Sequence, residues 1–143
     1  MLRIKSSAAA LAAFTFLAIT PAFAAQTVNV SLEGEGGSAM SIKLDQNKIK
    51  AGSVEFDVKN GAMSEAHEVI LVRLNSANQA LPFDKAKNRI DERKIKPLGE
   101  VADLAPGKSG KLTATLKPGA YALLCNIKGH YHAGMMAHLT VTQ

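Results

Sequence analysis

The chain has 143 residues, with 17 Lys or Arg against 12 Asp or Glu, a formal net charge of +5. It has no dense basic cluster with interleaved aromatic residues, which argues against a nucleic-acid-binding protein. Its single cysteine, Cys125, excludes an internal disulfide.

Residues 1–24 have the pattern of a secretory signal peptide. Arg3 and Lys5 precede an apolar run at 8–19, and Ala22-Phe23-Ala24 fits a small-x-small cleavage site. The apolar run is too short to span a bilayer comfortably, so we expect cleavage after Ala24 and export to the periplasm, with an uncleaved anchor as the alternative. Removing 24 residues from 143 leaves 119 (25–143), the size of one domain. No second apolar stretch is long enough for a membrane span, so stable membrane insertion is not expected.

The first half of this domain has the alternation of half-buried strands. It predicts strands over residues 26–32, 39–44, 47–50 and 53–59. The next segment, 67–74, is nearly all apolar, which predicts a central strand with both faces covered.

Residues 75–96 break this pattern because they are polar and charged. Ala86, Ile90 and Lys94 recur at helical spacing, which allows a short helix. The segment is longer than a tight connection between strands requires. We expect a solvated surface insert there, with partner recognition as the less favoured alternative.

The remaining strands are predicted over residues 98–104, 111–116, 118–124 and 137–142. Side chains alternate along a strand, so Tyr121, Leu123 and Cys125 should point to the same face. Short strands separated by frequent turns, with little helix, predict an all-β sandwich.

The most informative motif is C-x4-H-x4-M, formed by Cys125, His130 and Met135. A thiolate, an imidazole and a thioether on one short loop are soft ligands that suit copper. One more imidazole would complete a trigonal copper site, and His67 at the start of the apolar strand is the natural candidate. A lone free thiol in an exported protein is more often a buried inert group, and the neighbouring His and Met weaken that alternative.

These residues resemble the ligand motifs of the cupredoxins. The stretch from Pro118 to Cys125, followed by Gly129-His130 and Met135, is similar to their ligand loop, and Ala66-His67-Glu68-Val69 is similar to their upstream motif. The loop length is similar to that of the rusticyanin, auracyanin and sulfocyanin groups, rather than the shorter loop of plastocyanin. The resemblance implies a Greek-key sandwich of about eight strands.

The same resemblance implies one copper ion that cycles between Cu(I) and Cu(II). His67, Cys125 and His130 would form the trigonal plane, and Met135 would be the weak axial ligand. We also expect the backbone N–H of Glu68 to donate to the Cys125 sulfur.

Other soft side chains compete with this assignment. Met136 is the alternative axial ligand, and His132 and His138 are the alternative imidazoles, which we expect to be exposed. Met40 and Met63 fit packing roles better than ligation. Zinc is the second choice of metal, although a Met ligand argues against it. A Cys–His nucleophilic enzyme is disfavoured because no orienting third group is evident, so we predict that the protein is not an enzyme.

The expected function is single-electron transfer between larger redox proteins by a monomer. Electrons should pass mainly through the edge of His130, beside an apolar patch with Met63, Ala133 and Gly134. The mildly basic charge favours partners with acidic surfaces. The alternative is a copper carrier or chaperone, for which the additional His132, Met136 and His138 would supply ligands.

Overall fold

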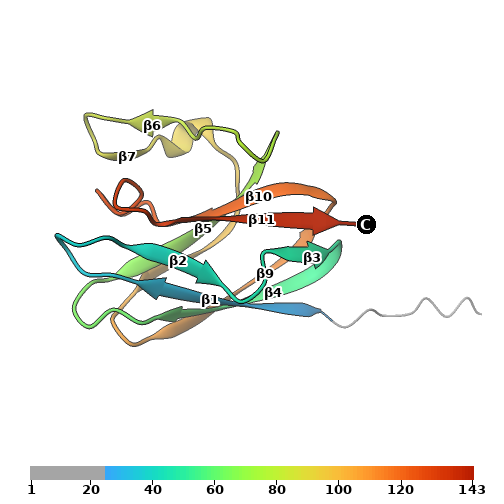
Figure 1. Cartoon of the computed structure of the whole chain (residues 1–143), viewed down its shortest axis with the longest axis horizontal. Coiled ribbons are helices and arrows are strands. Elements are labelled where there is room, and N and C mark those ends of the chain that lie inside the picture. Colours follow the sequence, from blue (N-terminus) through green and yellow to red (C-terminus); the bar gives the residue numbers. More distant parts are fainter. Residues whose placement is uncertain (1–24) are drawn as a thin grey trace, which may run out of the picture.

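A computed structural model describes residues 25–143 (Figure 1). The predicted signal peptide, residues 1–24, lies outside the described residues. None of the described residues, 25–143, belongs to a helix with the length and hydrophobicity of a membrane span.

Two β-sheets form the body of the protein. The first has the order β2-β1-β4-β9 and the second has the order β3-β11-β10-β5-β8. Their strands are β1 (Gln26–Glu33), β2 (Ser41–Leu44), β3 (Lys48–Lys50), β4 (Gly52–Asn60), β5 (His67–Leu74), β8 (Pro97–Leu104), β9 (Ser109–Leu116), β10 (Gly119–Leu124) and β11 (Met136–Thr142). The all-β sandwich is confirmed, with nine strands in the two sheets, including the three-residue β3, where about eight were expected.

The core lies between the sheets and follows the predicted alternation. Val28, Val30 and Leu32 of β1 face it and are almost completely buried. On β10, Tyr121 and Leu123 also face this core, and the chain then delivers Cys125 to the same apolar cluster.

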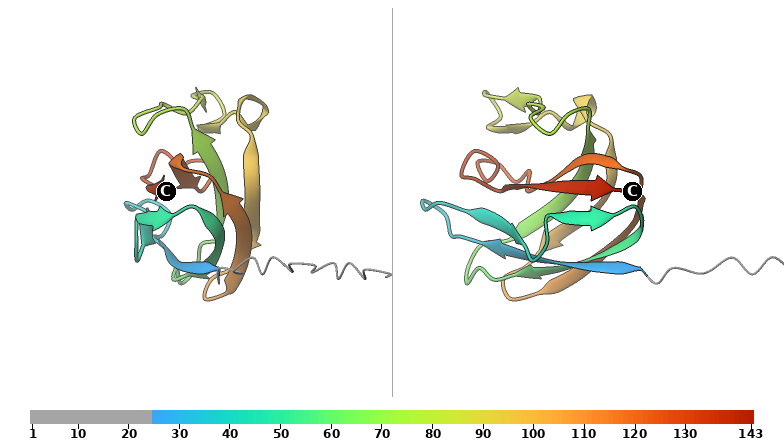
Figure 2. Two further views of the ribbon diagram at one scale, coloured as in Figure 1. Left: turned by 90° about the vertical axis from the view of Figure 1, so that its right-hand side faces the viewer. Right: turned by 45° about the vertical axis from the view of Figure 1, so that its right-hand side comes forward.

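Strand β5 has both faces covered, as its apolar sequence predicted. It lies between β10 and β8 in the second sheet. Val69 and Leu71 face the core between the sheets, while Ile70 and Val72 belong to a second apolar cluster on the outer face. Residues 75–96 lie outside the two sheets (Figure 2) and contribute to this second cluster.

The prediction that residues 75–96 could form a short helix is wrong. The segment contains the short hairpin β6 (Phe83–Asp84) and β7 (Arg89–Ile90), followed by one 3₁₀ turn, η1 (Glu92–Lys94). The Asp84 carboxylate accepts hydrogen bonds from the N–H groups of Ala86 and Lys87 at 3.0 and 3.1 Å. This local side-chain bonding favours a turn over a helix.

The expectation of a solvated insert is also wrong in part. Leu81 and Ile90 are buried in the apolar cluster against β5 and β10. We therefore call residues 75–96 the covering insert, because its apolar residues shield the outer face of these two strands.

Candidate metal centre

Three of the predicted ligands meet at one end of the sandwich. The candidate ligand atoms of His67, Cys125 and His130 all lie within 4.8 Å of one another. The two Nδ1 atoms are 3.2 Å apart, and the Cys125 sulfur is 3.5 Å from Nδ1 of His130. Within residues 25–143, this is the one group of three or more His, Cys, Asp or Glu side chains that is close enough to share a metal ion.

The pairing of β5 with β10 explains how distant residues meet. His67 is the first residue of β5, and Cys125 directly follows β10. These strands are antiparallel neighbours in which Leu124 lies opposite Ile70, so the start of one lies beside the end of the other. His130 is on the connecting loop, where its N–H donates to the Ile127 carbonyl at 3.0 Å.

Met135 is held beside this group through its backbone. Its N–H donates to the His130 carbonyl, and its carbonyl accepts from the Cys125 N–H, both at 3.1 Å. Its side chain is fully buried. Two residues before Met135, the Ala133 carbonyl accepts a hydrogen bond from the Met40 N–H at 2.9 Å. Met40 directly precedes β2, so this bond ties the loop to the first sheet.

A hydrogen bond orients the ring of His67. Its Nε2 lies 3.2 Å from the Gly34 carbonyl oxygen. A carbonyl can only accept, so Nε2 carries the proton and Nδ1 presents a lone pair to the centre. Gly34 has φ +116°, and a Cβ there would lie 2.7 Å from the Met40 Cα, so only glycine fits this close approach.

Burial determines the protonation of the other two groups. It raises the pKa of the Cys125 thiol to about 11, against the opposing effect of the hydrogen bond from the backbone N–H of Glu68. That N–H lies 3.5 Å from the sulfur, which confirms the predicted contact. Burial, together with His67, lowers the pKa of His130, which favours the neutral ring that a metal requires.

Two buried asparagines support the centre, and sequence reasoning missed both. Asn60 donates to the carbonyls of Glu65 and Leu104 at 2.9 and 2.8 Å, and so fixes the loop that enters β5 at His67. Asn126 follows Cys125 directly, and an amide beside a proposed ligand was the one available signal.

Asn126 connects the ligand loop to the covering insert. Its side-chain oxygen accepts from the Ile90 N–H at 2.6 Å, and its amide donates to the Ile90 carbonyl at 3.0 Å and to Glu92 at 2.6 Å. Its own backbone N–H donates to the Glu68 carboxylate at 2.9 Å. The residue after Cys125 is thus held by both β5 and the insert.

Two further contacts join the insert to the loop. The Gly129 N–H donates to the Asn88 carbonyl at 2.8 Å. The ring of Phe83 stacks on those of Tyr131 and His132, each at 5.8 Å between centroids. The covering insert therefore packs on the loop that carries three of the four predicted ligands.

The competing side chains lie apart from the three-residue group. His132 and His138 are exposed, as expected. Met63 is 88% exposed, whereas Met40 is buried in the core. Met136 packs against the outer cluster on the far side of the sheet from Cys125.

The donor set fits copper. Two imidazole nitrogens and one sulfur converge in a buried, apolar environment, with a buried thioether residue on the same loop. This is the ligand chemistry of trigonal copper centres. The nearest carboxylate in sequence, Glu68, accepts from the Asn126 N–H instead, and burial raises its pKa.

Comparison with known sequences also indicates a copper-binding protein. The family model described as "Copper binding proteins, plastocyanin/azurin family" matches residues 28–142. The chain is 32% identical over 128 residues to auracyanin-B of Chloroflexus aurantiacus, and this match covers 82% of the chain. It covers 53% of the relative, so the chain spans about half the length of that protein.

Solved structures share the fold at lower identity. Dithionite-reduced auracyanin from Roseiflexus castenholzii matches with a TM-score of 0.56 and 21% identity, over 84% of this chain and 99% of that one. Rusticyanin from Thiobacillus ferrooxidans matches with a TM-score of 0.61 and 18% identity, over 81% and 76% of the two chains. Because the family model matches nearly all of the described residues, the chain belongs to the copper-binding plastocyanin/azurin family, the cupredoxins, whose cofactor is copper.

Proposed function

We propose that this protein is a blue-copper electron carrier that passes single electrons between redox proteins and is not an enzyme. His67, Cys125 and His130 would hold one copper ion, and Met135 would supply a further, weaker sulfur ligand. The observation that carries the proposal is the convergence of three buried donors within 4.8 Å. When bound, copper would supply the one-electron chemistry, and the chain would supply position and environment.

The role of the chain is to hold the donors still. His67 and Cys125 are fixed by paired strands, and His67 is oriented by the Gly34 carbonyl. Backbone bonds tie Met135 to both Cys125 and His130. Such constraints keep the geometry similar in both oxidation states, which favours rapid electron transfer.

The proposed route for electrons is through His130. It is 7% exposed, while His67, Cys125 and Met135 are each 0% exposed. With Nδ1 facing the other donors, Nε2 is the nitrogen on the outer side of the ring. Exposed Met63 lies at the same end, where small and weak contacts with a partner would suit rapid exchange.

We place this activity in the periplasm, on the basis of the predicted signal peptide. Cleavage after Ala24 would leave Ala25 as the first residue. N-terminal sequencing of the exported protein tests this assignment, and an intact Met1 on protein recovered from the periplasm would contradict it.

The test of function is repeated redox cycling. The Cu(II)-loaded protein is reduced and reoxidised many times, and its copper content is measured after each cycle in the presence of a Cu(I) chelator. A carrier of electrons retains its copper and returns to the same spectrum. Loss of most copper on the first reduction would contradict the proposal.

That second outcome would support a copper carrier or chaperone. Exposed His132 on the ligand loop favours this candidate, since it could receive a departing ion. The burial of Cys125 and Met135 argues against it, because transfer to an acceptor requires accessible ligands.

A further inference from the structure

The net positive charge of the described chain is concentrated in one place. Residues 25–143 contain 15 Lys or Arg and 12 Asp or Glu, a surplus of three. The covering insert contains six of these positive and three of these negative residues, and Lys128 on the ligand loop adds one more positive charge. The rest of the described chain has eight positive and nine negative residues, so the entire surplus belongs to the insert and Lys128.

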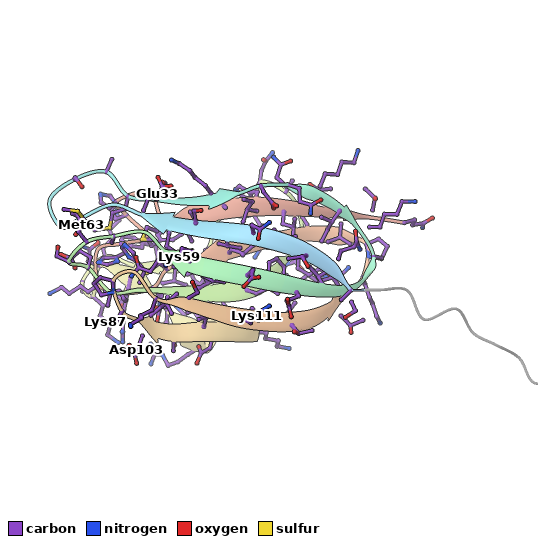
Figure 3. All side chains as sticks on the ribbon, turned by 90° about the horizontal axis from the view of Figure 1, so that it is seen from below. Glu33, Lys59, Met63, Lys87, Asp103 and Lys111 are labelled. Carbon is purple, nitrogen blue, oxygen red and sulfur yellow. The ribbon has the colours of Figure 1, made fainter. Side chains whose placement is uncertain are left out.

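This charge lies beside the metal centre. Lys128 is two residues before His130, and the next residue, Gly129, donates to the Asn88 carbonyl at 2.8 Å. Lys87, Arg89 and Lys128 line one open surface depression. Figure 3 shows Lys87 at the same end of the molecule as Met63.

Most of these side chains are not neutralised within the protein. Asp91 forms ion pairs with Arg93 at 2.8 Å and with Lys94 at 3.6 Å, so these two cations have a partner within the insert. Asp84 lies 3.9 Å from Lys87, at the limit of an ion pair. Among residues 25–143, the remaining basic side chains of the hairpin region form no ion pair: they are Lys85, Arg89 and Lys128. All four cations, Lys87 included, are exposed.

The opposite side of the metal end carries negative charge. Glu35 accepts from the N–H groups of Met63 and Ser64, and Glu65 accepts from the Gly36 N–H at 3.2 Å. Neither carboxylate forms an ion pair in the described chain. The charge across this end is therefore asymmetric, and such a pattern orients an approaching charged surface.

We propose that Lys85, Lys87, Arg89 and Lys128 form a basic patch that binds a carboxylate-rich surface of a redox protein. The contact orients that partner with its redox group toward His130. The proposal rests on the proposed electron-carrier function and adds to it the chemistry of the partner surface. Exposed cations of this kind accelerate and direct encounters more than they strengthen the final complex.

The experiment uses gold surfaces coated with a carboxylate-terminated monolayer as the probe of an acidic partner. The patch variant is Lys85→Glu, Lys87→Glu and Arg89→Glu together. The control variant is Lys48→Glu, Lys50→Glu and Lys117→Glu, three exposed residues on or near β3 and the start of β10, at the far end of the molecule (Figure 1). Both variants change the net charge by the same amount.

Two quantities are measured on each surface. One is the adsorbed mass of the metal-free and copper-loaded proteins, and the other is the voltammetric electron-transfer rate of the copper-loaded protein. The wild type should adsorb, and salt should weaken its adsorption. The patch variant should lose about tenfold or more in adsorption affinity and in rate, whereas the control should lose much less. Replacing the same three residues with Gln should give an intermediate loss.

Equal losses in the patch and control variants would overturn the proposal, because net charge alone would then explain adsorption. Binding to phosphatidylglycerol vesicles without binding to the carboxylate surface would also overturn it and would assign the patch to a membrane. Adsorption of the metal-free protein tests the basic patch alone, because no copper contributes to it. Failure of the electron-carrier function would appear separately, as loss of copper during redox cycling in solution.

Discussion

Cys125 has the side chain whose proton couples copper binding to pH. Burial raises the pKa of its thiol to about 11, so the metal-free protein holds this proton at neutral pH. Copper requires the thiolate, and binding therefore releases one proton. The predicted copper affinity rises about tenfold per pH unit between pH 7 and pH 9.

Competition with a chelator of known affinity measures this slope. His130 adds no proton release in that range, because burial and His67 lower its pKa. The Cys125→Ser variant is the control and should show a shallower slope. A wild-type affinity that does not change between pH 7 and pH 9 would contradict the assigned thiolate ligand.

Met135 provides the second residue-scale prediction. Met135→Leu removes the thioether sulfur and preserves an apolar side chain in the same buried position. The variant should retain copper, and its reduction potential should rise, because the loss of one donor in an apolar environment destabilises the more highly charged Cu(II) more than Cu(I). Redox titration measures the shift. The Met136→Leu variant serves as the control, and an equal shift in both variants would argue against Met135 as the axial ligand.

The sequence was most informative for the ligands and least informative for their supports. His67 and Cys125 were predictable because a copper site needs particular donor atoms at the ends of strands. Asn60 and Asn126 were not, because their partners lie far along the chain: Asn60 bonds to Leu104, and Asn126 bonds to Ile90. An amide has no periodic signal that would show which distant backbone group it satisfies.

The covering insert gives the prediction at the scale of elements. Asn126→Ala would leave the buried N–H and carbonyl of Ile90 without their side-chain partner. Each unsatisfied group costs about 1–3 kcal/mol, so the free energy of unfolding should fall by roughly that amount or more. The contact between the insert and the ligand loop should also loosen, which would broaden the electron paramagnetic resonance spectrum of the copper-loaded protein.

Denaturant unfolding and the electron paramagnetic resonance spectrum are measured on the same variants. Asn78→Ala is the matched control, because Asn78 is an exposed residue of the same insert with no side-chain hydrogen bond in the described chain. It should change neither quantity. A variant at Asn126 with wild-type stability and spectrum would show that the insert does not position the ligand loop.

Strands were predictable where one face is buried and the other is exposed. Alternation in 26–32 and 53–59 corresponds closely to β1 and β4, and the apolar run His67–Leu74 is β5. The insert was different because Ala86, Ile90 and Lys94 match a helical period by spacing alone. Ile90 is instead fixed in β7 by Asn126, a tertiary contact that overrides local periodicity.

At the scale of the whole molecule, the metal should stabilise a fold that already exists without it. The donors are positioned by hydrogen-bonded strands and by hydrogen bonds from the protein itself, such as that between His67 and Gly34. Copper at a hundred times its dissociation constant adds about 2.7 kcal/mol of stability. Removing it should lower the Tm by about 10 °C and leave the far-ultraviolet circular dichroism of the folded protein unchanged.

Differential scanning calorimetry of the copper-loaded and metal-free proteins measures this effect. The Cys125→Ser variant should show a much smaller difference in Tm between its two forms. If the metal-free wild type were unfolded at room temperature, the centre would not be preformed by the strands.

The visible absorption spectrum of the Cu(II)-loaded protein, compared between the wild type and Cys125→Ser, tests most directly whether His67, Cys125, His130 and Met135 form a blue-copper centre. The wild type should show an intense charge-transfer band from the Cys125 thiolate to copper, and this band should disappear in the variant. A Cys125→Ser protein that binds Cu(II) and retains the same intense band would contradict the ligand assignment.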